Sequence, residues 1–172
     1  WRERLYDVIG FQQRTIDVDG VHYSWYEYLL FNPYFGFRYL TEYNGHWNDV
    51  QTLRLLPAMN TSKAKVQAMV RGTSFTHFST AVARTTYVLG EFFWKVQVGE
   101  MVMASDYIAP PYVLSAEVAL SRDSRGTGNA QEINFSQGVY VPREEIAQAF
   151  GVDTLPQGWQ ISANQPNPVD GK

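Results

Sequence analysis

The feature that most constrains the fold is a recurring alternation of apolar and polar residues with a period of two. Successive side chains of a β-strand point to opposite faces, so an alternation of this kind predicts strands. It is clearest over residues 92–98, 112–120 and 133–136. Because one parity of each segment is polar, each predicted strand has one face in water, as is typical of antiparallel sheets.

Two tight hairpins are predicted in the first third of the chain, because each contains a dipeptide that favours the positive φ angles of short turns. One helix is predicted over residues 142–150, since a proline and two acids open it and a glycine follows it. The hairpins join residues 6–18 to 21–31 through Asp19-Gly20, and residues 37–43 to 46–53 through Asn44-Gly45.

The chain of 172 residues has the length of one domain and needs no disulfide or metal to fold. A break near residues 56–62 allows a division into two β subunits, over about 1–56 and 63–151. Residues 152–172 are expected to form an extended tail or linker, and residues 121–130 a mobile hairpin tip. We therefore expect a single mainly β domain, with antiparallel sheets that form a sandwich or barrel of about nine or ten strands and one short C-terminal helix.

Composition and motifs exclude several kinds of protein and site. The chain has no cysteine, which rules out disulfides, thiolate metal sites and a cysteine nucleophile. Its net charge of −3 lacks the basic excess of a nucleic-acid-binding surface, and no run of 18 apolar residues could span a membrane. The sequence contains no nucleophile elbow or phosphate-binding loop, and we expect no metal or cofactor.

A small set of residues could bind a ligand or catalyse a reaction, although core packing or a solvated face would explain most of them. Paired carboxylates can perform general acid–base chemistry, as in glycoside hydrolases, and aromatic rings can stack on sugars. The three histidines, His22, His46 and His77, lack the spacing of metal ligands, and we interpret the first two as polar residues at strand starts. The candidate binding residues are Trp25, Glu27, Glu91, Trp94, Asp106 and Glu117.

The carboxylates among these candidates differ in their settings. Glu117 falls on the solvent-facing parity of its strand, and Glu91 follows a glycine and fits the cap of a turn. Glu27 instead interrupts the apolar parity of residues 21–31, and a buried carboxylate is unfavourable unless it is paired or hydrogen-bonded. We therefore predict a partly buried Glu27 in a structural role, bonded to an arginine or to backbone amides. Arg38, beyond the next turn, is a candidate partner.

Several short motifs follow one another along nearly the whole chain. They are WYEYLL (25–30), NGHW (44–47), GEFFW (90–94), VGE (98–100), DYIAPP (106–111), LSAE (114–117) and QPNP (165–168). Their order resembles a bacterial family known as domain of unknown function 4178. The resemblance implies a cytoplasm-facing module of a longer bacterial protein, which can be tethered to a membrane, and it implies no activity and no catalytic residues.

The absence of nucleophile, metal and phosphate signatures favours a non-enzymatic function. We expect a protein-binding or assembly module of a larger bacterial protein, located in the cytoplasm, with a protein partner that the sequence does not identify. The alternative is a hydrolase that uses paired carboxylates on a sugar-like substrate. Two of the acids within about 5–10 Å of each other in a deep cleft would favour the enzyme. Acids that are scattered, or bonded to arginines, would favour the binding module.

Overall fold

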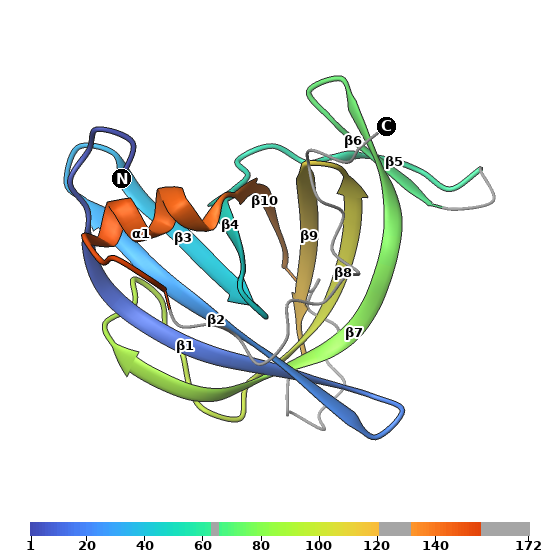
Figure 1. Ribbon diagram of the computed structural model, residues 1–172. Coiled ribbons are helices and arrows are strands. Elements are labelled where there is room, and N and C mark those ends of the chain that lie inside the picture. Colours follow the sequence, from blue (N-terminus) through green and yellow to red (C-terminus); the bar gives the residue numbers. More distant parts are fainter. Residues whose placement is uncertain (63–65, 121–131, 156–172) are drawn as a thin grey trace.

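The computed structural model describes residues 1–62, 66–120 and 132–155, and Figure 1 shows a barrel of antiparallel strands with one helix beside it. The predicted hairpin tip over residues 121–130 and most of the predicted tail over 152–172 lie outside the described residues. The strands are β1 (Asp7–Val18), β2 (Val21–Asn32), β3 (Gly36–Tyr43), β4 (His46–Thr52), β5 (Ala58–Asn60), β6 (Gln67–Val70), β7 (Thr73–Gly90), β8 (Met101–Ala109), β9 (Tyr112–Ala119) and β10 (Ile133–Val141), and the helix is α1 (Arg143–Phe150).

The barrel consists of two four-stranded meanders that pair along both of their sides. Strands β1 to β4 form the first meander and β7 to β10 the second. β4 pairs with β10 and β1 pairs with β7, both antiparallel, so eight strands close into a ring. β6 and β5 continue the sheet from the first part of β7, outside the ring (Figure 1). The predicted mainly β fold is therefore confirmed, and its form is a barrel rather than a sandwich.

Local sequence accounts for the two hairpins and the helix. Asp19 and Asn44 adopt φ angles of 54° and 48°, and the glycine after each also has a positive φ, as the predicted turns require. Helix α1 ends at Gly151, whose left-handed φ of 64° allows its N–H to donate to the carbonyl of Gln148. Both predicted hairpins and the predicted helix are confirmed, with bounds that agree to within one residue at each end.

The prediction of a strand over residues 92–98 is wrong, because this segment lies in the connection between β7 and β8. Gly90 has a φ of 85° and turns the chain away from its partner strand β1. Two aromatic side chains of this segment, Phe93 and Trp94, pack on β3 instead. The ring centre of Phe93 lies 4.1 Å from that of Phe37, and the ring of Trp94 lies 5.8 Å from that of Tyr39.

Two clusters of buried apolar side chains lie on the outer face of the strands. The strand register shows this, because their members in the barrel strands alternate with residues of the inner face. In the first cluster, Leu40 and Trp47 pack under Ile146 of α1. In the second, Phe75 and Leu114 pack together beside β6. Most of the buried apolar side chains therefore lie in two patches on the outside of the ring. The inner face carries the buried Leu29, which lies two residues from Glu27, together with polar side chains.

The end of β7 passes very close to β1, and glycine at Gly90 makes this approach possible. A methyl group added at Gly90 would collide with the carbonyl oxygen of Ile9, whereas one added at Gly72, which has the same φ of 85°, meets nothing within 4 Å. We expect Gly72→Ala to lower the free energy of unfolding by about 1–2 kcal/mol through backbone strain, and Gly90→Ala to lower it by about 1–3 kcal/mol more. Urea denaturation of both variants measures the difference. Equal losses would contradict the close crossing of β1 and β7.

Candidate functional site

An ion-paired cluster lies inside the barrel and joins the two meanders. In the β1–β2 hairpin, Gln12 is opposite Glu27 and Arg14 is opposite Trp25, so these four side chains share one face. The guanidinium of Arg14 also contacts Glu117 of β9, although β7 and β8 separate β9 from β1 around the ring. A contact between strands so far apart can form only across the interior. The shared face is therefore the inner one.

The carboxylate of Glu27 is held by three donors. Trp25 Nε1 donates to its Oε1 at 2.7 Å, Gln12 Nε2 donates to its Oε2 at 2.5 Å, and Arg14 Nη1 lies 3.3 Å from Oε1. The side chain is 12% exposed. Glu27 is thus partly buried and bonded to an arginine, as predicted. The predicted identity of that arginine is wrong, because Arg38 pairs with Asp49 instead.

Glu117 shares the same arginine but has a more open setting. Arg14 Nη1 lies 2.6 Å from Glu117 Oε1, and the Glu117 side chain is 30% exposed. The prediction that Glu117 faces solvent from the outside of its strand is wrong. The polar parity of β9 points into the barrel, where Glu117 meets Arg14. Since both acids contact one nitrogen, their nearest oxygens lie within about 6 Å of each other, a separation of the kind found between the acids of glycoside hydrolases.

Burial shifts the pKa values of several groups in this interior. It raises the pKa of Glu117, with the charge of Glu27 acting in the same direction and Arg14 opposing it. Burial likewise raises the pKa of Asp106, against the hydrogen bond from Ser115 and the charge of Arg14. Burial by itself would lower the pKa of Arg14. The two neighbouring carboxylates outweigh this effect, so the pKa is raised. Arg14 therefore stays charged, whereas Glu117 and Asp106 ionise less readily than free carboxyl groups.

Tyr39 connects this cluster to the aromatic side chains at one end of the barrel. Its pKa is raised by burial and by the nearby charges of Glu27 and Glu117. Its ring also lies 5.8 Å from the ring of Trp94.

The six sequence candidates separate into groups. Trp25, Glu27 and Glu117 are joined through Arg14, and Asp106 lies on the same inner face. Trp94 lies at the end of the barrel, and Glu91 is exposed in the β7–β8 connection.

Sequence reasoning missed the cation at the centre of the cluster and its neighbour Gln12. Gln12 and Arg14 alternate with Phe11 and Gln13 in β1, and a polar parity of this kind is read as a solvated face. Arg14 is nevertheless only 7% exposed and Gln12 only 5% exposed. The signal that could have found Arg14 is its position two residues from Gln12 and directly opposite Trp25 in the predicted hairpin.

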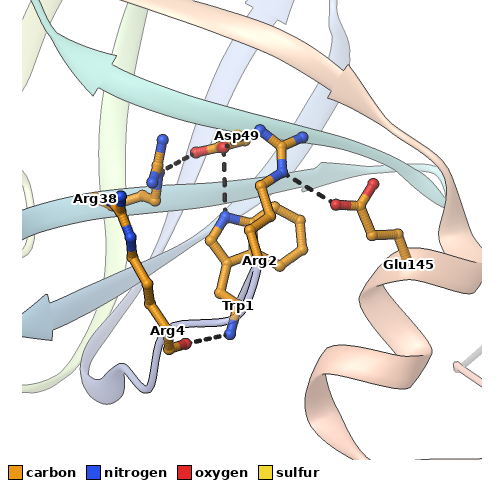
Figure 2. Close-up of polar contacts among 6 residues, drawn as sticks. All are labelled: Trp1, Arg2, Arg4, Arg38, Asp49 and Glu145. Atoms are coloured by element: carbon orange, nitrogen blue, oxygen red, sulfur yellow. Dashed lines mark hydrogen bonds and ion pairs between the residues drawn. The ribbon is translucent and has the colours of Figure 1, made fainter.

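A second buried carboxylate, Asp49, organises the outer face (Figure 2). Asp49 is 3% exposed, and Arg38 Nε donates to its Oδ1 at 2.6 Å. Trp1 Nε1 donates to its Oδ2 at 3.4 Å, and Arg2 Nη1 lies 3.3 Å from the same oxygen. Arg2 also pairs with Glu145 of α1 at 3.0 Å. These contacts fasten the N-terminal segment and α1 to the barrel, which is a structural role.

The histidines, and the possibility of a metal site or a membrane-spanning helix, can be checked in the described residues. His22 lies 3.1 Å from Asp17 on the surface, and His77 is hydrogen-bonded to Thr80 at 2.8 Å. Within residues 1–62, 66–120 and 132–155, no three His, Asp or Glu side chains are arranged to hold a metal ion. No helix in this part of the chain is long and apolar enough to cross a membrane.

The three donors around Glu27 predict how its replacement affects stability. Glu27→Ala removes the acceptor of Gln12 and Trp25 and one of the two carboxylates that pair with Arg14, so we expect the free energy of unfolding to fall by about 1–3 kcal/mol. Glu27→Gln keeps one acceptor oxygen and should lose less. Urea denaturation of both variants tests the order. Unchanged stability in both variants would contradict a structural role for Glu27.

The raised pKa of Glu117 predicts a pH-dependent stability with a definite sign. A carboxyl that binds its proton more tightly when folded stabilises the fold fully below its ordinary pKa of 4.5, and this contribution is lost as the pH rises through the raised folded value. Arg14, Glu27 and Asp106 are the charged groups around it. We therefore expect Glu117→Gln to gain thermal stability relative to the parent chain as the pH increases above 4.5. A constant difference in melting temperature between the two proteins from about pH 4 to about pH 8, the range in which carboxyl groups titrate, would contradict this.

Comparison with known proteins places the chain in a family and gives no further relative. No curated protein matches it, and no solved structure matches it. Residues 1–143 match the family described as Domain of unknown function (DUF4178). The match covers all ten strands of the barrel and its extension, together with the Arg14 cluster. The chain therefore belongs to the DUF4178 family.

Proposed function

We propose that this chain is a non-enzymatic, protein-binding module of a larger bacterial protein in the cytoplasm. The observation that carries this proposal is the engagement of Glu27. Both of its oxygens accept hydrogen bonds from protein donors, and Glu117 is paired with the same guanidinium. A catalytic base or nucleophile must present an oxygen to its substrate. Carboxylates that are tied to an arginine fit a structural support better than a catalytic pair.

A cluster of four aromatic side chains at one end of the barrel, three of them exposed, is the surface best suited to a partner. We call this cluster the aromatic rim; it consists of Phe37, Tyr39, Phe93 and Trp94. Phe93 is 54% exposed, and Phe37 and Trp94 are each 39% exposed. Single exposed apolar residues are common, but touching aromatic rings are characteristic of protein interfaces.

A hydrolase is the second candidate, and one observation favours it. Glu27 and Glu117 have the short separation of paired catalytic acids, and burial raises the pKa of Glu117 while Glu27 is held by three donors. Two carboxyls in unlike environments are the arrangement that assigns one acid to proton donation. In this reading, Glu117 would be the proton donor and its pairing with Arg14 would break when substrate binds.

One experiment separates the two functions. The chain is immobilised, bound bacterial proteins are identified by mass spectrometry, and the same preparation is assayed for hydrolysis of aryl glycosides. We expect a specific protein that is lost with Trp94→Ala and retained with Phe78→Ala, since Phe78 is 66% exposed on another part of the surface. We expect no hydrolysis. Glycoside cleavage that disappears in Glu117→Gln would overturn the proposal in favour of the enzyme.

A further inference from the structure

We propose that the partner inserts a basic side chain, an ammonium or guanidinium group, between the aromatic rim and Glu117. This inference rests on the proposed protein-binding function and specifies the chemistry of its partner. It follows from three independent features: the position of the rim, the charges on the inner face of the barrel, and the different hydrogen bonding of its two glutamates.

The aromatic rim and Glu117 lie at the same end of the ring. In an antiparallel barrel of two meanders, the end at which β2, β4, β7 and β9 finish is the end at which β3, β8 and β10 begin. Tyr39 lies in the first half of β3, and Glu117 is two residues from the end of β9. The charge of Glu117 reaches Tyr39, whose ring neighbours Trp94. A side chain that enters past the rim therefore approaches Glu117.

The charges on the inner face of the barrel favour a cationic occupant. In the described strands, the register and contacts place three carboxyl groups on this face, those of Glu27, Asp106 and Glu117, and one guanidinium, that of Arg14. One cation does not balance three acids. An additional positive group would complement the surplus, whereas an anion would oppose it.

The two glutamates bound to Arg14 differ in their capacity to accept a further hydrogen bond. Glu27 has three donors and is 12% exposed. Within the described residues, Glu117 accepts a side-chain hydrogen bond from Arg14 and keeps 30% of its side chain exposed. Its second oxygen is therefore the natural acceptor for a donor that comes from outside. Aromatic faces beside such an acceptor add cation–π attraction for the same group.

Peptide titrations test this inference directly. The probe is the peptide acetyl-Gly-Lys-Gly-amide, titrated into the ¹⁵N-labelled chain, and the matched controls carry norleucine or glutamate in place of lysine. We expect the lysine peptide to shift the Trp94 indole resonance and to bind at least about tenfold more tightly than either control. Equal binding of the norleucine peptide would overturn the proposal, because the rim would then recognise apolar groups without charge.

Variants of the chain locate the contact. Glu117→Gln should weaken binding of the lysine peptide about tenfold, whereas Glu144→Gln, an exposed acid on α1, should leave it unchanged. Thermal melts of both variants confirm that they are folded. If Glu117→Gln leaves lysine binding intact, the inference fails. If a protein partner is nevertheless lost with Trp94→Ala, the proposed protein-binding function still holds. If the partner is retained with Trp94→Ala, both the inference and the proposed function fail.

Discussion

The interaction on which this structure depends is the ion pairing of one guanidinium across the interior of a closed ring. Arg14 belongs to the first meander and Glu117 to the second, so their contact connects, across the interior, two halves that are also joined by strand pairing at their sides. Removing one member of such a buried group leaves the others uncompensated, which is far more damaging than exchanging the whole group for apolar residues. The interior therefore combines charged groups with apolar residues such as Leu29, while the two apolar clusters lie on the outside.

The hairpins, the helix and the environment of Glu27 could be predicted because each is encoded locally. A turn dipeptide fixes its own backbone, and an acid in an apolar parity needs a partner wherever the strand lies. The orientation of Glu117 could not be predicted in the same way. Alternation distinguishes two faces, but only the closure of β1 on β7 decides which face is inside. The same limit applies to residues 92–98, where Phe93 and Trp94 contact β3 from a loop rather than from a strand.

Two groups of acids among the described residues illustrate complementary solutions to one problem. Asp49 is neutralised by arginines from β3 and from the N-terminal segment, on the face that α1 covers. Glu27 and Glu117 share a single arginine on the other face. In the first set, Arg2 and Arg38 are matched by Asp49 and Glu145, whereas the second has two acids on one arginine and stays partly open. Of the two sites, the inner one is better suited to receive a group from outside.

The three-residue strand β5 has a consequence for the behaviour of the protein in solution. Closure of the ring gives both sides of each barrel strand a neighbour, so among the described residues the free margin of the sheet is at β5. Unpaired margins are where sheets of separate molecules join and grow into fibres. A margin of three residues offers few backbone groups for such growth. The geometry of the fold therefore offers little backbone for growth of this kind, even though many aromatic side chains remain on its surface.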